Sequence, residues 1–201
     1  MKRKFLLPVA FIIISANVLQ AQIEKRDWLL GGTFGFSTTS NGSSPAYSNA
    51  NITPHIGYAL SNNAVVGLNL SLNYIQNNSN NNNFDLSTNL FYKKFFPSGQ
   101  KFGVYARVNA GLGWSENTYT LLDSAGSNVK KNFTITNYII GAAPGIYYKI
   151  APGILLDADC GGIVYYYSKE SGGHVSNFSI NFFSSFIFGI EFILGKKRDS
   201  N

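Results

Sequence analysis

The stretch "NFSINFFSSFIFGIEFIL", residues 177–194, decides the fold class of this chain. Its even positions carry large apolar side chains, with Ser184 as the exception: Phe178, Ile180, Phe182, Phe186, Phe188, Ile190, Phe192 and Leu194. Several of its odd positions are small or polar: Ser179, Asn181, Ser185, Gly189 and Glu191. A strand sorts alternate residues onto two faces, whereas a helix would spread both sets around its circumference. The stretch therefore predicts one extended strand, whose backbone groups need a surrounding sheet.

Seven further stretches alternate in the same way and, with 177–194, predict eight strands: 28–39, 52–60, 65–74, 84–92, 102–114, 138–150 and 154–167. Phe91 falls on the polar face of its strand, and Pro54 lies inside the weakest stretch. Pro144 cannot donate to a ladder and indicates a bulge or a distorted position. In 154–167 the alternation predicts an apolar face formed by Leu156, Ala158, Cys160, Val164 and Tyr166. It predicts an opposite face formed by Asp157, Asp159, Gly161 and Tyr165.

The predicted connections alternate in length. Three short ones fall at 61–63, 97–100 and 151–153 and are rich in the Asn, Pro and Gly of tight turns. Four longer ones fall near 39–47, 76–83, 116–131 and 168–176. An even number of strands, with short turns at one end and longer loops at the other, is typical of up-and-down outer-membrane barrels.

Composition indicates which face of the sheet points outward. A soluble barrel such as a lipocalin would also alternate, but it must cover itself with charge, and soluble chains are about 25% charged. This chain is 13% charged. Aromatic residues on the apolar face lie near several strand ends, where amphipathic rings favour a bilayer interface: Trp28, Tyr58, Tyr74, Tyr92, Trp114, Tyr138, Tyr148 and Tyr166. We therefore expect an all-β, eight-stranded antiparallel transmembrane barrel over residues 22–195, with a soluble barrel as the alternative.

The N-terminus has the order of a secretory signal peptide. Lys2, Arg3 and Lys4 precede an apolar run over 5–19, and Ala21 precedes Gln22. We expect cleavage after Ala21, which N-terminal sequencing of the outer-membrane form tests; a chain that still carries residues 2–4 would contradict it. An uncleaved anchor is the alternative, although the apolar run is short for a membrane span. Removal of the leader lowers the net charge from +6 to 13 − 10, or +3.

Composition argues against nucleic-acid binding and against cysteine-based sites. Beyond Lys196, Lys197 and Arg198 in the polar tail over 196–201, the mature chain has no basic cluster, so nucleic acid is not an expected partner. Cys160 is the single cysteine, which rules out an internal disulfide and a cysteine-rich metal site. We assign no catalytic, metal or cofactor-binding residue and expect no cofactor.

The strand pattern resembles the small eight-stranded outer-membrane barrel family, which includes the barrel domain of outer-membrane protein A and the free-standing protein X. The resemblance covers essentially all of the mature chain. It implies a non-enzymatic barrel of the gram-negative outer membrane, with a role in envelope integrity or surface interaction. The expected partners are outer-membrane lipid, lipopolysaccharide and the barrel-assembly machinery, and the expected state is a monomer. In family members the last strand often ends on an aromatic residue, which the barrel-assembly machinery recognises. Here "GKKRDSN" follows Leu194, so we expect Phe192 to serve as this recognition signal.

Inward-facing charge is the sharpest candidate feature. Lys93 and Arg107 fall on the fourth and fifth strands, and Asp157, Asp159 and Glu191 on the seventh and eighth. In a ring of eight strands these two groups stand nearly opposite each other. Because buried charges need partners, we expect a lumen charge network. It would act as a structural plug or, alternatively, as the gate of a narrow channel.

Three motifs carry weaker hypotheses. His174 and Ser176 resemble the His and Ser of outer-membrane lipid A deacylases, but hydrolysis needs an acid that orients the His. Glu191, the acid downstream, has the parity of the opposite face, so a His in a loop is the alternative to a lipid hydrolase. The Asn-rich run over 77–83 indicates a flexible external loop with a possible recognition role. The "DSA" at 123–125 resembles a bacterial O-glycan acceptor motif.

Overall fold

The computed structural model describes residues 23–39, 47–77, 82–122, 128–170, 173–183 and 187–195. These ranges contain ten strands: β1 (Trp28–Thr39), β2 (Tyr47–Ser61), β3 (Ala64–Asn77), β4 (Asn82–Pro97), β5 (Phe102–Leu122), β6 (Asn128–Ala151), β7 (Ile154–Asp159), β8 (Ile163–Glu170), β9 (Gly173–Ile180) and β10 (Ile187–Leu194). Within these ranges, no helix is long and apolar enough to cross a membrane.

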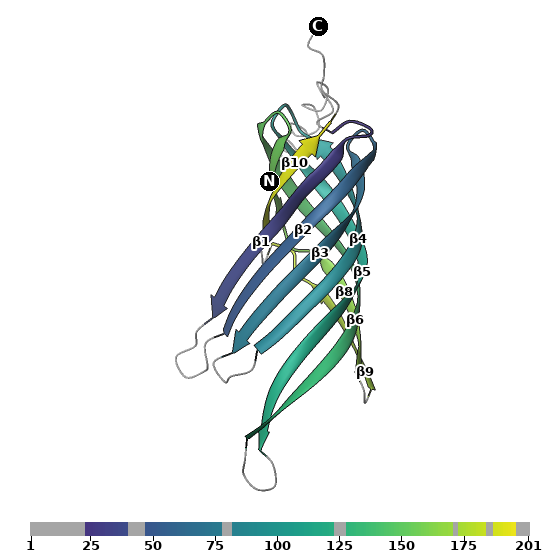
Figure 1. Ribbon diagram of the computed structural model, residues 1–201. Helices are drawn as coiled ribbons and strands as arrows, with labels where there is room; N and C mark the ends of the chain where they lie inside the picture. The colour runs from purple at the N-terminus through teal and green to yellow at the C-terminus, as the bar shows by residue number, and fades with distance from the viewer. Residues whose placement is uncertain are drawn as a thin grey trace, which may run out of the picture.

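The sheet closes into a ring. Each strand from β1 to β6 pairs antiparallel with the next, β6 pairs with β7, β7 with β10, and β10 with β1. β8 and β9 continue the sheet from β6, away from the end of the barrel where β1 begins and β10 ends (Figure 1). The predicted eight-stranded antiparallel barrel is confirmed: the seventh and eighth strands are each divided into two segments.

The two faces of the barrel follow the predicted alternation over most strands. Side chains at even positions, such as Leu68, Val108 and Ile140, point outward and are roughly half exposed. Odd positions line the lumen, and Phe91 is buried there as its parity indicated. A ring of apolar side chains exposed all around a sheet is far larger than the patches that soluble monomers tolerate. The outer surface is therefore suited to hydrocarbon.

The three predicted short turns are confirmed, and they gather at the end of the barrel where β1 begins and β10 ends (Figure 1). Asn63, Gly99 and Gly153 have positive φ values of 62°, 97° and 81°, the backbone conformation that tight turns require. In outer-membrane barrels the end with the short turns is periplasmic and the opposite end is external, and the two ends of this barrel are named accordingly here.

Two of the four long loops are shorter than predicted. β5 and β6 stay paired as far as Leu122 and Asn128, and β8 and β9 as far as Glu170 and Gly173. The expectation followed the apolar alternation, which ends near Trp114, but backbone pairing in a two-stranded ribbon continues without it. The tips of all four external connections lie outside the described residues.

A bulge in the seventh strand overturns part of the predicted facing. Asp159 pairs with Gly145 and Ile163 pairs with Ala142, so residues 160–162 oppose only 143–144. One extra residue reverses the parity that follows it. Val164 and Tyr166 therefore face the lumen and Tyr165 faces outward, the reverse of the expectation. Gly161, with φ of 74°, and Pro144, which has no N–H, both accommodate the bulge.

The predicted single strand over 177–194 is also wrong, because it is divided into β9 and β10. At the level of the bulge the chain turns: the Asn181 N–H donates to the Gly162 carbonyl (2.9 Å), and the Phe183 N–H donates to the Cys160 carbonyl (2.9 Å). Phe178 on β9 and Phe188 on β10 both point outward, so the alternation looks continuous across the break.

Candidate functional site: a layered lumen

An apolar cluster closes the lumen at the short-turn end. Its members are buried and come from nearly every strand of the ring: Ile23, Leu29, Ala59, Val65, Phe91, Phe95, Tyr105, Tyr147 and Leu155, with Ile193 packed against them. Ile23 precedes β1 and is buried in the barrel at the short-turn end, where its carbonyl accepts a hydrogen bond from the Asn63 N–H (3.0 Å). Side chains thus fill the cross-section of the lumen at this level.

Glycines on the inner face make room for these aromatic rings. A Cβ at Gly145 would collide with the ring of Tyr105, and a Cβ at Gly103 would collide with the ring of Tyr147. Phe95 packs between the two tyrosines, with ring centroids 5.8 Å and 5.4 Å away. The small residues on the polar face therefore leave space for large side chains from neighbouring strands.

A layer of charged side chains lies next to this cluster, on the side that faces the external end of the barrel. The Lys93 ammonium donates to Asp157 (Nζ to Oδ2, 2.5 Å) and to Glu191 (Nζ to Oε1, 2.6 Å). The second oxygen of Glu191 lies 2.9 Å from Nε2 of His55. Lys93 also lies over the ring of Tyr105, 4.0 Å from its centroid. Each charge in this group therefore has a partner within hydrogen-bonding distance.

A second group completes the charged layer. The Arg107 guanidinium donates to Oδ2 of Asp159 (2.5 Å), and the Tyr105 hydroxyl donates to Oδ1 of the same carboxylate (2.7 Å). Tyr105 touches both groups and joins them. The structure thus brings all five predicted charged residues into one layer, arranged as Lys93 with two acids and Arg107 with one.

His55 is a member of this layer that the sequence analysis left out. Its parity places it on the polar face, opposite Ile52 and Ile56, and this signal could have included it. Its ring is buried and packs edge-on against Phe91, with centroids 5.7 Å apart. The imidazole supplies a third nitrogen group for a layer that contains three carboxylates.

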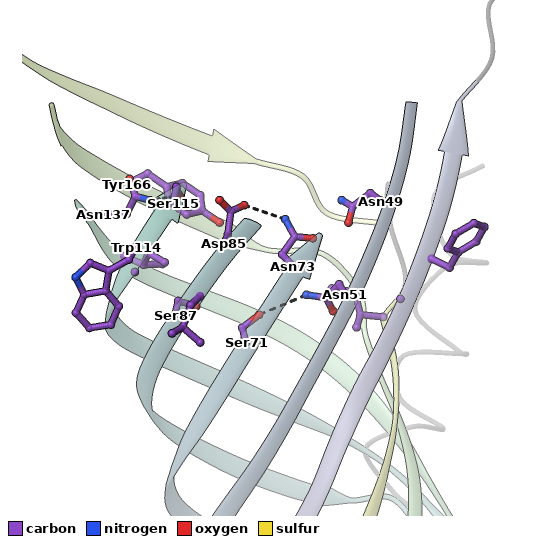
Figure 2. Close-up of a pocket in the computed structure, with 16 residues that line it drawn as sticks. Asn49, Asn51, Ser71, Asn73, Asp85, Ser87, Trp114, Ser115, Asn137 and Tyr166 are labelled. Carbon is purple, nitrogen blue, oxygen red and sulfur yellow. Dashed lines mark hydrogen bonds between the residues drawn. The ribbon is translucent and has the colours of Figure 1, made fainter. Parts of the chain in front are cut away.

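A polar cavity, here called the vestibule, occupies the lumen between the charged layer and the external end. Its lower part borders the charged layer, and its upper part lies nearer the external end. Its upper part has a volume of about 500 Å³ and its lower part about 320 Å³, and the two share Asn51, Ser71 and Tyr166 in their walls. Figure 2 shows the upper part, with Asn, Ser and Asp side chains directed inward and Trp114 directed away. The lower part reaches Arg107 and Asp159, so the charged layer is its floor.

Hydrogen bonds tie the vestibule walls together from strand to strand. The Asn73 amide donates to Asp85 (3.0 Å), and the Asn89 amide donates to Asn69 (2.9 Å). Further round the ring, the Ser168 hydroxyl donates to the Asn137 amide oxygen (2.6 Å). Unlike the layers below it, this part of the lumen is lined mainly by uncharged polar groups, with Asp85 as the charged residue of its upper part, and it remains open.

The motif His174–Ser176 lies on β9 and not in a loop, because the β8–β9 pairing extends to Gly173. The His174 ring stacks on Tyr167, with centroids 5.7 Å apart. Glu191, the candidate orienting acid, is buried in the lumen against Lys93. The structure therefore does not bring His174, Ser176 and Glu191 together.

Other candidate groups give less. Among the described ranges, no cluster of three or more His, Cys, Asp or Glu side chains is arranged to hold a metal ion. The "DSA" at 123–125 and most of the Asn-rich run, 78–81, lie outside the described residues, as does the tail over 196–201.

Solved structures similar to this chain are small outer-membrane proteins. The N-terminal β-barrel domain of Pseudomonas aeruginosa OprF is 18% identical, with a TM-score of 0.39, and the match covers 85% of this chain and 98% of that one. The Neisserial surface protein A is 15% identical, with a TM-score of 0.39 and coverage of 83% and 96%. The attachment invasion locus protein of Yersinia pestis is 14% identical, with a TM-score of 0.37 and coverage of 85% and 99%.

The comparison with curated proteins found no match. The comparison with protein families found one over residues 6–186, which span β1 to β9 and most of the chain. That family is described as the outer membrane protein beta-barrel domain. A closed antiparallel ring with an apolar outer face agrees with the match, and the chain belongs to the outer membrane protein beta-barrel domain family.

Proposed function

We propose that this protein is a non-enzymatic, non-conducting barrel of the gram-negative outer membrane, which supports envelope integrity or surface interaction through its external end. The observation that carries the proposal is the double closure of the lumen. A solute that passed the vestibule would meet the Lys93 and Arg107 ion pairs and then the apolar cluster around Phe95. Eight-stranded rings leave little more than side-chain space inside.

The β5–β6 hairpin supports a role at the surface. These are the longest strands, with 21 and 24 residues, and they remain paired beyond the other strands (Figure 1). Extension of the sheet past the barrel rim does nothing for closure of the ring. It is an arrangement that presents backbone and side chains to partners outside the cell.

The proposed environment follows from the apolar outer face. Outer-membrane lipid and lipopolysaccharide would contact side chains such as Phe34 and Ile140, which are exposed on the outside of the ring. Export through a cleaved signal peptide would deliver the chain to the barrel-assembly machinery, which would insert it as a monomer. The first described residue, Ile23, would then follow the new N-terminus directly.

A narrow or gated channel is the second candidate, because the vestibule already provides an open polar path through the outer half of the lumen. Opening would require the ion pairs of Lys93 to separate and the apolar cluster to move. A membrane-embedded lipid hydrolase ranks third, since Glu191 is committed to Lys93 and His55.

Planar bilayer recording separates the first two candidates. The purified barrel is expected to insert without steady single-channel conductance at moderate voltage, because two layers of packed side chains cross the lumen. A trimeric porin reconstituted in the same way provides the positive control. Reproducible conductance steps that vanish in a Phe95→Trp variant would replace the proposal with the channel.

The surface role is tested in a deletion strain that carries a shortened form of the barrel. Residues 117–133 are replaced with an Asn-Gly turn that joins Glu116 to Thr134, which are paired across β5 and β6. A deletion strain that carries this shortened barrel should retain detergent resistance but lose adhesion to host cells or matrix. Unchanged adhesion together with lost resistance would restrict the role to envelope integrity.

A further inference from the structure

Asp85 on β4 is a carboxylate of the lumen that has no cationic partner in the structure. The three carboxylates of the charged layer are each paired with Lys93 or Arg107. Asp85 instead accepts a hydrogen bond from the uncharged Asn73 amide, 3.0 Å from Nδ2 to Oδ2. Within the described ranges, no Lys, Arg or His side chain lies at ion-pair distance from it. Because a carboxylate inside a barrel gains from a nearby cation, Asp85 is the natural starting point of a binding site.

The charged side chains that line the vestibule carry a net negative charge. Asp85 is the charged residue of the upper part. Arg107 and Asp159 line the lower part and are paired with each other, so the three groups sum to 1 − 2, or −1. A cavity lined by one sign of charge, inside a wall of low dielectric constant, concentrates ions of the opposite sign. The upper part of the vestibule therefore favours a cation over an anion.

Three side chains of the upper part can be reached from the cavity. Asp85 and Ser87 are successive inward residues of β4, and both are partly exposed. Tyr166 comes from β8, with β5 and β6 between it and β4, and it is 40% exposed. Figure 2 shows the Asp85 and Tyr166 side chains directed into the cavity. A carboxylate, a hydroxyl and an aromatic ring thus face the same space.

These groups are complementary to a primary ammonium group. The carboxylate accepts a charge-assisted hydrogen bond from an N⁺–H, and the Ser87 hydroxyl oxygen accepts a second one. The face of the Tyr166 ring attracts a cation. A quaternary ammonium group has no N–H to donate, and it is usually held by a cage of several aromatic rings. The acceptors in this site therefore suit an amine that carries hydrogen-bond donors.

The size of the upper part suits a small organic molecule. Its volume of about 500 Å³ lies within the range of about 300–1,000 Å³ that is usual for small-molecule sites. A single metal ion would fill little of this space. In the part of the chain that the structure describes, no group of three His, Cys, Asp or Glu side chains is placed to hold such an ion.

We infer that the upper part of the vestibule binds the primary ammonium group of a small organic amine. Asp85 is its counter-ion, Ser87 its second acceptor and Tyr166 an aromatic wall of the site. The inference goes beyond the proposed function and requires no conduction, because the apolar cluster around Phe95 closes the lumen at the other end. A lysine side chain of an external protein carries the same group, so the test separates a free amine from a peptide.

The test uses protein labelled with ¹⁵N at asparagine and reconstituted in phosphatidylcholine nanodiscs at constant ionic strength. Cadaverine should shift the side-chain amide signal of Asn73, which donates to Asp85, in a saturable way. The signals of Asn62 and Asn63, in the turn between β2 and β3 at the short-turn end, should stay in place. Failure of cadaverine to shift the Asn73 signal would overturn the site.

Three further ligands test the chemical class. Pentanediol has a carbon chain of the same length without charge and should shift no signal at the same concentration. Choline has a quaternary ammonium group and should bind at least about tenfold more weakly, because it cannot donate to the carboxylate. A short blocked peptide with one lysine should also bind at least about tenfold more weakly, because its backbone must enter a cavity of limited size. Equal binding of any of the three would overturn the corresponding part of the assignment: the charge, the N–H donors or the free amine.

Asp85→Asn keeps the shape of the side chain and removes its charge. It should lower the affinity for cadaverine at least about tenfold, since an ionic hydrogen bond becomes a neutral one. Glu116→Gln is the matched control, because Glu116 is exposed on the outer face of β5, next to Ser115, the cross-strand partner of Asp85. This control should bind with wild-type affinity. Equal losses in the two variants would mean that the amine responds to the overall charge of the external end and not to Asp85.

A second pair of variants tests the aromatic wall and keeps the inference falsifiable if Asp85→Asn fails to fold. Tyr166→Phe keeps the ring and should retain the affinity within about twofold, whereas Tyr166→Leu should lose about fivefold. Both variants must keep heat-modifiable migration in detergent. Wild-type affinity in Tyr166→Leu would remove the ring from the site, and equal losses in both variants would assign its role to the hydroxyl instead.

Discussion

Lys93→Met is expected to destabilise the barrel by about 3–5 kcal/mol, the range for removal of one partner from a buried ion pair. The Lys93 ammonium is the shared partner of Asp157 and Glu191. Without it, two buried carboxylates would face each other, and only His55 would remain as a partner of Glu191. Equilibrium urea unfolding in lipid vesicles, followed by tryptophan fluorescence, measures the change.

Lys94→Met is the matched control, because it removes the same charge from the adjacent residue. Lys94 points out of the barrel and makes one long contact, 3.5 Å from Nζ to the Asn62 carbonyl, at an exposed site. Its loss should change the free energy of unfolding by no more than about 0.5 kcal/mol. Equal losses in the two variants would mean that the lumen pairs contribute nothing particular to stability.

A triple variant separates charge from shape. Asp157→Asn and Glu191→Gln, added to Lys93→Met, remove the two carboxylate charges that Lys93→Met leaves behind. Most of the lost stability should return, since the penalty comes from uncompensated charge and not from the missing salt bridge. A triple variant as unstable as Lys93→Met would instead indicate that the contact of the Lys93 ammonium with the Tyr105 and Phe95 rings dominates.

The barrel class could be predicted because alternation reports directly on the two faces of a strand. The facing of Tyr166 could not. Pro144 and Gly161 signal an irregularity, but the number of extra residues depends on backbone pairing across β6 and β7. An irregularity of two residues would have kept the parity, and one residue reversed it. The break between β9 and β10 could not be predicted from the alternation either, because outward-facing residues remain at even positions on both sides of it.

The charged layer was accessible to the sequence because each charge sits at an inward position. Which charges pair depends on strand stagger and side-chain length, so Lys93 could not be assigned to Asp157 and Glu191 in advance. His55 is a lone histidine in the weakest alternating stretch, next to Pro54, so nothing near it in the sequence marked it as part of the layer. The vestibule depends on how far inward-facing side chains reach across the lumen at each level, and periodicity contains no information on that.

Val108→Arg is expected to destabilise the barrel by about 2–4 kcal/mol if the outer face meets the middle of the bilayer. Val108 is 49% exposed on the outside of β5, next to Ala142 of β6. A guanidinium at this position must lose most of its hydration or thin the bilayer around it. Leu70→Arg on β3, with the same outward parity, should repeat the effect.

Asn109→Arg is the control, because Asn109 is the next residue of β5 and lines the lower part of the vestibule. Its guanidinium would enter a polar cavity of about 320 Å³ instead of hydrocarbon, although crowding against Arg107 would have its own cost. Accordingly, the loss should be smaller than in Val108→Arg, and it should change little when the vesicle lipids are exchanged for a short-chain detergent. The loss in Val108→Arg should shrink in that detergent, because a micelle adapts to a buried charge more readily than a bilayer does. A larger loss for Asn109→Arg in both environments would mean that the apolar face does not meet hydrocarbon, and the soluble-barrel alternative would then account for the alternation better than a membrane barrel does.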